Sequence, residues 1–358
     1  MARLQAPPAG SENDDAIMPP RPDPENPAVS PLTKKKLQPV QVPPSREVPS
    51  LAQDVLAGLF SSPRQLPPKY FYDARGSMLF DRICRTPEYY PTRTETALLK
   101  RHAGDIARLA RPTTIVEFGS GSYAKARLIL GACAEQGLEP VYAPFDVCAD
   151  VLTESGAALR REFPWLEIEP LVGDFTAGLE HVPLQPGRRL LMFLGGTIGN
   201  FDEGDAEAFL TEVRSLMRRE DCLLLGADRV KSPAVLHAAY NDRDGITAQF
   251  NLNVLAVLNA ELGSDFDLSN FEHRALYNPD AERIEMYLDS VIDQRIGFRR
   301  LGRTLELQAG ESILTEISRK FTTASLLAML DAAGLRALRH FESDGPLFSL
   351  VLAARADV

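Results

Sequence analysis

The sequence predicts a doubly wound α/β fold, in which helices cover a mainly parallel sheet, together with a second, smaller α+β subdomain. Strand and helix patterns alternate from about residue 113 to residue 225, which is typical of parallel strands joined by helical crossovers. The segments 114–118 and 190–194 are almost entirely apolar, as expected of strands that are buried on both faces. After residue 231 the alternation ends, and a long helical pattern followed by strands of period two indicates an inserted subdomain.

Each element follows from a run of one periodicity between turn residues. In the first part we expect strands at 114–118, 140–146, 166–172, 190–194 and 222–225 and helices at 123–130, 149–163 and 205–217. In the second part we expect a helix around 248–262 and strands at 283–288 and 313–318, after which a helix at 324–333 and a strand at 347–353 resume the first sheet. The segment 51–96 is expected to pack on the insert. This organisation gives one domain from 95–230 and 320–358 and a subdomain from 51–94 and 231–319.

The first 50 residues differ in composition from the rest of the chain. They hold 12 of the 27 prolines and no aromatic residue. Such a segment cannot bury enough apolar surface to offset the entropy lost on ordering. We therefore expect residues 1–50 to form a disordered, proline-rich extension.

The overall composition excludes several classes of protein. The formal net charge of −10 argues against a nucleic-acid partner, because phosphate contacts need a basic face. No stretch has the length of a membrane span and the N-terminus lacks the apolar core of a signal peptide, so we expect a cytoplasmic protein with no membrane partner. The four cysteines show no C-x-x-C spacing and the five histidines form no H-x-x-x-H pair, so we expect no metal site. We expect the partner to be a small molecule and the protein to be a monomer.

A glycine-rich loop follows the first predicted strand of the sheet. Gly119 and Gly121 lie between the strand 114–118 and the helix 123–130. Glycines let the backbone approach a ligand closely, and the helix N-terminus offers unsatisfied N–H groups to an anionic or polar group. The arrangement is typical of a nucleotide-binding crevice. Because Gly119, Gly121 and Ala124 also satisfy the relaxed pattern G-x-G-x-x-G/A, the loop alone fits NAD and S-adenosyl-L-methionine about equally well.

Polar residues are expected at the carboxyl ends of the neighbouring strands, where parallel sheets bind ligands. Asp146 is placed to accept hydrogen bonds from ribose hydroxyls, and Asp174 to accept one from an adenine amino group. Lys125 can reach the methionine carboxylate of a cofactor, although an exposed helix lysine is an equally good interpretation. The turn 195–200 holds three glycines and ends in Asn200, whose amide offers both a donor and an acceptor; this favours a binding site over a local helix cap.

The strand predicted at 313–318 carries a carboxylate and a hydroxyl two residues apart. Period two places Leu314, Glu316, Ser318 and Lys320 on one face, and on the neighbouring strand Met286 can form an apolar wall. Glu316 and Ser318 can together bind a ring with polar N–H edges. The pattern alone favours the simpler interpretation, a surface strand with salt bridges.

Several long strings of this chain resemble the L-histidine Nα-methyltransferases of ergothioneine biosynthesis. They are FYDARGS at 71–77, PEYYPTRTE at 87–95, PFDV at 144–147, FLGGTIGN at 193–200, GITAQFN at 245–251, IEM at 284–286 and TEISRKF at 315–321. The similarity extends from about residue 51 to residue 355 and leaves the proline-rich extension outside. Its strings are unusual and occur in the family's order, which makes the resemblance specific.

The resemblance implies a Rossmann-like class I methyltransferase sheet in the domain of residues 95–230 and 320–358, with substrate bound by the subdomain. It implies S-adenosyl-L-methionine as the methyl donor, L-histidine as the substrate and three methylations of the α-amine to give hercynine. It assigns cofactor contacts to Gly119, Lys125, Asp146, Asp174 and Phe175 and the substrate carboxylate to Asn200 and Tyr240. It assigns the imidazole to Glu316 and Ser318, with Tyr89 over the ring, Met286 lining its pocket and Tyr72 as the catalytic residue near the amine. The chain departs from the family's usual residues at Gly196, where a serine is common, and at Tyr123-Ala124, where a Ser-Glu pair is common.

Other functions remain compatible with parts of the pattern. An N-methyltransferase of another aromatic amino acid, such as tryptophan, shares the cofactor loop, but we expect it to have a larger and less acidic ring pocket than Glu316 and Met286 provide. A nicotinamide-dependent oxidoreductase or a non-catalytic nucleotide-binding module shares only the crevice. The residues of the late insert, rather than the loop, favour histidine.

Overall fold

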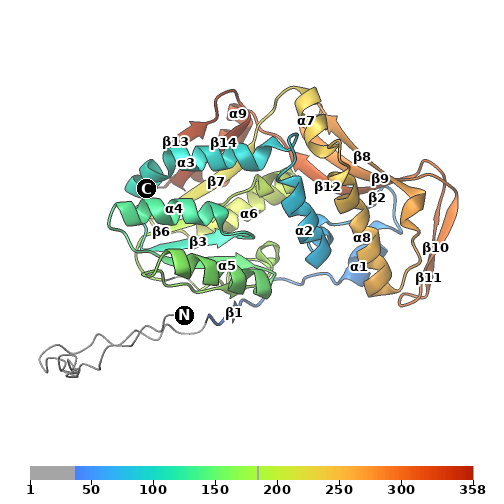
Figure 1. Cartoon of the computed structure of the whole chain (residues 1–358), viewed down its shortest axis with the longest axis horizontal. Helices are drawn as coiled ribbons and strands as arrows, with labels where there is room; N and C mark the ends of the chain where they lie inside the picture. Colours follow the sequence, from blue (N-terminus) through green and yellow to red (C-terminus); the bar gives the residue numbers. More distant parts are fainter. Residues whose placement is uncertain (1–36, 184, 358) are drawn as a thin grey trace, which may run out of the picture. The chain divides into compact units, whose positions relative to one another are not determined.

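The computed structural model describes residues 37–183 and 185–357, and its larger sheet has eight strands (Figure 1). In spatial order they are β1 (Val40–Gln41), β5 (Leu171–Val172), β4 (Val141–Asp146), β3 (Thr114–Phe118), β6 (Arg189–Phe193), β7 (Cys222–Asp228), β14 (Phe348–Arg355) and β13 (Leu335–Glu342). The first six strands in this order run parallel to one another, whereas β14 is antiparallel to both of its neighbours. Strands β3, β6 and β7 are buried along their whole length, as apolar runs predict.

The strand order reverses between β3 and β6. From β3 the chain continues to β4 and β5 on one side, and from β6 it continues to β7 on the other. The connections after such neighbouring strands lead in opposite directions, which leaves a crevice at their carboxyl ends that ligands occupy. Gly119 directly follows β3 and Leu194 directly follows β6, so the loops that begin there border this crevice.

Helices cover both faces of the larger sheet. They are α3 (Tyr90–Ala110), α4 (Ala124–Glu135) and α5 (Ala149–Glu162) on the face toward the viewer in Figure 1, and α6 (Glu203–Leu216) and α9 (Thr323–Ala332) on the other. Leu99, Ile129 and Leu159 pack on the first face, and Phe209 and Leu326 on the second. Among the described residues, no helix is long and apolar enough to cross a membrane.

A second sheet is formed largely by the late insert. Its strands, in spatial order, are β2 (Arg64–Gln65), β12 (Ser312–Arg319), β9 (Arg283–Ser290) and β8 (Phe271–Asn278), and a separate hairpin pairs β10 (Gln294–Phe298) with β11 (Arg303–Leu307). The helices beside it are α1 (Leu51–Gly58), α2 (Ala74–Ile83), α7 (Pro233–Tyr240) and α8 (Ile246–Leu262). Val55, Phe71 and Leu79 join Phe250 and Val254 of α8 in one apolar core. This confirms that the segment before the large sheet packs on the insert.

The structure confirms most predicted helices and strands and corrects the extent of several. Helix α4 continues to Glu135 and strand β7 to Asp228, beyond their predicted ends at 130 and 225. Helices α1, α2, α3 and α7 were not predicted. The strand predicted at 166–172 is wrong over most of its length, because only Leu171 and Val172 form β5 and Ile168 makes an isolated bridge to Tyr142. Pro170 has no N–H to donate to a neighbouring strand, which limits the pairing. Strands β8, β10, β11 and β13 were not predicted, because exposed and polar positions weaken their apolar periodicity.

The prediction of disorder through residue 50 is wrong for its last part. Val40 and Gln41 form β1, which pairs with β5, and the Val42 N–H continues the ladder by donating to the Val172 carbonyl at 2.8 Å. Arg46 then donates from Nη2 to the Thr176 carbonyl at 2.7 Å. Main-chain pairing with the free edge of β5 supplies the order that the apolar content of the segment could not. Residues 1–36 of the predicted extension lie outside the described residues.

Candidate active site

The loop after β3 is shaped by two glycines in the left-handed region. Gly119 has φ of +64° and Gly121 has φ of +45°, a conformation that side chains disfavour. A Cβ atom on Gly119 would lie 3.2 Å from the Phe175 ring. The Gly121 N–H donates to Asp146 Oδ2 at 3.0 Å, so the carboxylate at the end of β4 holds the glycine loop.

Two unsatisfied polar features show that this loop fits the polar cofactor expected there. The Ser120 hydroxyl is buried and has no hydrogen-bond partner among the described residues. Helix α4 begins directly after the loop, and its N-cap residue Tyr123 provides no side-chain cap, so the first N–H groups of the helix stay available to a polar ligand. A buried hydroxyl without a partner is costly, and a polar ligand in the crevice would supply that partner.

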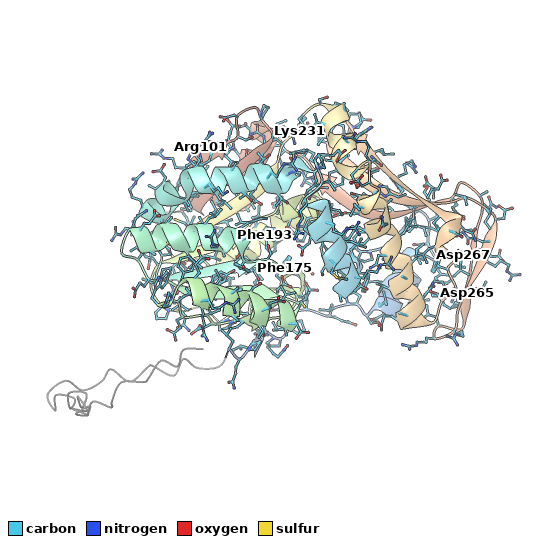
Figure 2. The ribbon with its side chains drawn as sticks, in the orientation of Figure 1. Arg101, Phe175, Phe193, Lys231, Asp265 and Asp267 are labelled. Atoms are coloured by element: carbon cyan, nitrogen blue, oxygen red, sulfur yellow. The ribbon has the colours of Figure 1, made fainter. Side chains whose placement is uncertain are left out.

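The loop after β5 continues the same edge of the sheet. Asp174 uses Oδ1 to accept from the Thr176 N–H at 2.8 Å and the Thr176 hydroxyl at 2.6 Å, which leaves Oδ2 for another donor. The Phe175 ring lies 5.6 Å from the Phe193 ring, centroid to centroid (Figure 2), and is the nearest group to a Cβ placed on Gly119. The structure thus brings Gly119, Asp146, Asp174 and Phe175 to one edge.

Lys125 lies at this edge but is already paired. Its ammonium contacts Glu95 Oε2 at 2.6 Å, and Glu95 Oε1 accepts from the Gly195 N–H at 2.8 Å. The Glu95 side chain is 1% exposed, and Gly226 of β7 leaves it room, since a Cβ there would come within 2.2 Å of Glu95 Oε1. Sequence reasoning missed Glu95, although it lies in the string PEYYPTRTE. It ties the helix of Lys125 to the loop after β6.

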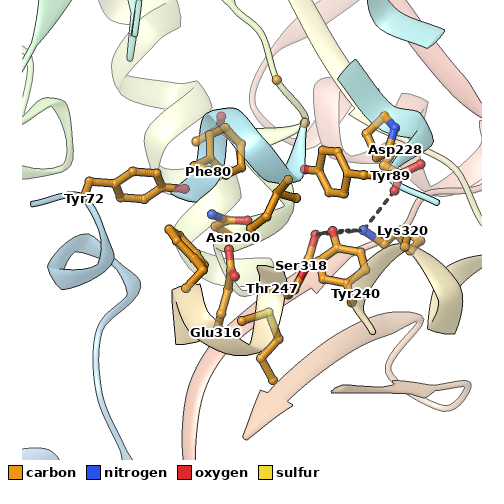
Figure 3. A pocket seen from close by; sticks show the side chains of 18 residues that line it. Tyr72, Phe80, Tyr89, Asn200, Asp228, Tyr240, Thr247, Glu316, Ser318 and Lys320 are labelled. Atoms are coloured by element: carbon orange, nitrogen blue, oxygen red, sulfur yellow. Dashed lines mark hydrogen bonds and ion pairs between the residues drawn. The ribbon is translucent and has the colours of Figure 1, made fainter. Parts of the chain in front are cut away.

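A single pocket collects every residue that the resemblance assigned to the substrate (Figure 3). It lies between the end of β6 and the second sheet, and the predicted residues that line it are Tyr72, Tyr89, Asn200, Tyr240, Met286, Glu316 and Ser318. Gly195 and Gly196 also line it, and a Cβ on Gly195 would lie 3.2 Å from Lys125 Nζ. The pocket therefore reaches the edge that carries the expected cofactor residues.

A β-bulge sets which residues of β12 face the pocket. Leu314 pairs with Tyr287, but Glu316 pairs with Met286, so Thr315 is an extra residue in the ladder. Directly paired residues share a face of the sheet, which places Glu316 beside Met286 and Leu314 on the opposite face. The prediction that Leu314 shares the face of Glu316 is wrong, because strict alternation does not continue through a bulge.

Glu316 is the acidic group of the pocket. Burial raises the pKa of its carboxyl to about 7, although Lys320 and a hydrogen bond with Asn200 act in the opposite direction. The carboxyl therefore changes charge near neutral pH. A ring N–H that donates to it favours the charged form.

The raised pKa of Glu316 predicts a pH-dependent cost to stability. Between pH 4.5, the ordinary pKa, and about pH 7, the folded carboxyl keeps a proton that the unfolded chain has lost. As the pH rises through this range, this group therefore lowers the free energy of unfolding by about 3 kcal/mol. We expect Glu316→Gln to remove this decline. Urea unfolding of both proteins at pH 5 and pH 8 measures it; the paired comparison is needed because burial also raises the pKa of Glu117 to about 7. Equal pH dependence in the two proteins would contradict this expectation.

The tyrosines of the pocket are neutral phenols. Burial, and then the field of Glu316, raise the pKa of Tyr72 above its ordinary value. Burial is also the main cause of the raised pKa values of Tyr89 and Tyr240. The residue Tyr72 as a whole is 42% exposed, but its hydroxyl end points into the pocket, toward Asn200 (Figure 3). These hydroxyls can donate and accept hydrogen bonds without acting as phenolate bases.

Sequence reasoning missed several residues that line the same pocket. Lys320 was placed on the face of Glu316 but not expected to be buried, and Asp228, Phe80, Thr247 and Phe250 were not considered. Asp228 ends β7, at the same edge as Asp146, so its position in the parallel sheet is the signal that could have identified it.

Substitution of Gly119 by alanine is expected to weaken cofactor binding about tenfold. The new Cβ meets the Phe175 ring, and the left-handed backbone adds a strain of about 1 kcal/mol. Calorimetry with S-adenosylhomocysteine measures the loss. Gly137→Ala is the matched control, because Gly137 has φ of +68° but nothing within 4 Å of a Cβ; an equal loss in both variants would show that backbone strain alone is responsible.

The sheet order with its antiparallel strand β14, the glycine loop after β3 and the carboxylate at the end of β4 agree with a class I S-adenosyl-L-methionine-dependent methyltransferase. The model of a known family, described as "Histidine-specific methyltransferase, SAM-dependent", matches residues 51–355. This chain belongs to that family.

Curated relatives include enzymes of more than one substrate. The histidine N-alpha-methyltransferase of Mycobacterium tuberculosis is 46% identical over 306 residues, covering 86% of this chain and 95% of the relative. Ergothioneine biosynthesis protein 1 of Neurospora crassa is 31% identical over 63% of this chain and 28% of its own length. An L-tryptophan methyltransferase of Psilocybe serbica is 29% identical over 80% of this chain and 88% of its own length.

Proposed function

We propose that this enzyme transfers three methyl groups from S-adenosyl-L-methionine to the α-amino group of L-histidine, giving hercynine for ergothioneine biosynthesis. The family and the names of the mycobacterial and Neurospora relatives support this function. The observation that carries it is the group formed by Glu316, Ser318 and Met286, which gathers a carboxylate, a hydroxyl and an apolar wall in one pocket. This group suits a small ring with two polar edges.

For the cofactor we propose contacts along the edge of the large sheet. Asp146 would accept from the ribose, Asp174 from the adenine amino group, and Gly119 with Phe175 would border the base. Lys125, held by Glu95 beside Gly195, would contact the methionine part. S-adenosyl-L-methionine supplies an electrophilic methyl group, so the task of the chain is to align the amine with it.

For the substrate we propose that Glu316 and Ser318 bind the imidazole against Met286 and Tyr89. Asn200 would hold the carboxylate. Tyr240, which the resemblance also assigned to the carboxylate, would lie beside it without donating to it, because the Tyr240 hydroxyl donates to Ser318 Oγ. Tyr72 would orient the α-amine at the mouth of the pocket. Each methylation before the last leaves a proton to be removed; since Tyr72 keeps its own proton, it would relay this proton to water by accepting and donating hydrogen bonds.

The proposed division of labour assigns residues 95–230 and 320–358 to the cofactor and residues 51–94 and 231–319 to the substrate. The pocket between the end of β6 and the second sheet supports it. We also propose that the protein is a monomer. We propose that it acts in the cytoplasm, which the four free cysteines of the described chain support.

Mass spectrometry of an incubation with S-adenosyl-L-methionine and all the standard amino acids tests this function. We expect only histidine to gain methyl groups, up to three. Methylated tryptophan without methylated histidine would establish the alternative that the Psilocybe relative represents. Binding of NAD in place of S-adenosylhomocysteine would reject a methyltransferase altogether.

A further inference from the structure

One of the residues that line the pocket is a buried lysine. Lys320 directly follows β12, and its side chain is fully buried. Its ammonium lies 2.9 Å from Asp228 Oδ2, 2.9 Å from the Tyr240 hydroxyl and 2.8 Å from Ser318 Oγ (Figure 3). An unpaired buried charge is costly, so the position of Lys320 depends on these three partners.

Asp228 keeps the lysine charged. Its carboxylate also accepts from the Tyr90 hydroxyl at 2.7 Å and from Lys231 Nζ at 2.5 Å. Burial acts to raise the pKa of Asp228, but Lys320 and Lys231 outweigh it and the pKa falls below its usual value. Burial acts to lower the pKa of Lys320, but Asp228 outweighs it and the pKa rises. Both groups therefore stay ionised near neutral pH.

The donors of Lys320 constrain the hydrogen bonds around Ser318. An ammonium has three N–H donors and no acceptor, and Lys320 has three acceptors at hydrogen-bond distance. The Tyr240 hydroxyl accepts from Lys320 and donates to Ser318 Oγ at 2.9 Å. Ser318 Oγ thus accepts from both Lys320 and Tyr240, which occupies its two lone pairs. Its own hydrogen is left for a ligand.

We propose that Lys320 is a positioning residue for substrate recognition, which fixes Ser318 as a donor toward the ring nitrogen that carries no hydrogen. This inference rests on the function proposed above and deepens it. Glu316 accepts from the ring N–H while Ser318 donates to the bare nitrogen. The pocket then recognises one neutral tautomer of imidazole and no ring that offers only N–H groups.

This arrangement of an acceptor at Glu316 and a donor at Ser318 also accounts for discrimination against indole. Indole has one N–H and no bare ring nitrogen, so the Ser318 donor would remain unpaired in the pocket. Sites built to hydrogen-bond a substrate reject analogues that leave their polar groups unpaired, by factors as large as about 10⁴. Lys320 therefore contributes to selectivity without itself touching the ring.

The test compares histidine with two analogues that lack the bare nitrogen. The analogues 3-(pyrrol-2-yl)-L-alanine and 3-(pyrrol-3-yl)-L-alanine keep one ring N–H each, in the two positions that the imidazole tautomers offer. We expect Lys320→Met to lower kcat/KM for histidine about 100-fold, mainly through KM, and to change kcat/KM for the better pyrrole analogue less than threefold. Lys100→Met, at an exposed lysine of α3, is the control and should preserve the ratio between the two substrates.

Two further variants keep the test decisive if Lys320→Met does not fold correctly. Calorimetry with S-adenosylhomocysteine checks the folding of each variant. Ser318→Ala removes the donor itself and should show the same selective loss for histidine. Lys320→Gln keeps N–H donors and should retain more selectivity than Lys320→Met. Equal loss for histidine and the pyrrole analogue in Lys320→Met would overturn the proposal and leave Lys320 a structural residue. Failure of the unaltered enzyme to methylate histidine would instead reject the proposed function.

Discussion

Substitution of Glu316 by alanine is expected to lower kcat/KM for histidine at least 100-fold while leaving the affinity for S-adenosylhomocysteine within twofold. The change removes the acceptor for the ring N–H and leaves the Asn200 amide without the partner that it has in this structure. Unpaired polar groups in a buried site are the main source of such losses. Initial rates over a range of histidine concentrations, with calorimetry for the cofactor product, measure the two effects separately.

The control for this experiment is Glu272→Ala, which removes an exposed carboxylate from β8 on the same sheet. It should retain the activity of the unaltered enzyme. Turnover of histidine by Glu316→Ala at the normal rate would contradict the assignment of the ring pocket. A parallel loss of cofactor affinity would mean that Glu316 supports the fold of both sites.

Substitution of Glu95 by alanine is expected to destabilise the protein by roughly 3 kcal/mol and to weaken S-adenosylhomocysteine binding at least tenfold. Breaking a buried ion pair from one side leaves the partner charge uncompensated, and here the Gly195 N–H also loses its acceptor. Lys125 and the loop after β6 would then lose the anchor that holds them together. Urea unfolding and calorimetry measure the two losses.

Glu95→Gln separates the two contacts, because its amide oxygen can still accept from Gly195 while the charge opposite Lys125 is gone. We expect an intermediate loss of cofactor affinity. Glu135→Ala, at an exposed position of α4, controls for the loss of a carboxylate from a helix. Unchanged cofactor affinity in Glu95→Ala would show that the ion pair serves stability alone.

The large sheet was predictable because its central strands are buried on both faces. A run such as Leu190–Leu194 leaves few alternatives to a buried strand, and the glycines of the next turn mark where it ends. Strands β8 and β13 carry charged residues on partly exposed faces, so no apolar periodicity identified them. The strand β1 depends on pairing with β5, a partner that local sequence does not reveal.

The site was predictable in its residue types more than in its geometry. The spacing of Glu316, Ser318 and Lys320 correctly indicated one face, but no pattern showed that this face is buried. Lys320 read as a solvated charge because its partner Asp228 is 92 residues away in the sequence, and only the fold brings the two within 2.9 Å. Glu95 escaped notice for the same reason.

The bulge at Thr315 has a consequence for how substrate preference can evolve in this fold. This one extra residue determines on which face of the sheet each later side chain of β12 lies. Loss of that residue would therefore turn the pocket side chains to the opposite face, although none of them had been replaced. A single-codon deletion could thus abolish histidine recognition where several substitutions would otherwise be required. Relatives should therefore be aligned on the bulge before their ring-binding residues are compared, since a gap misplaced by one position would equate residues that point in opposite directions.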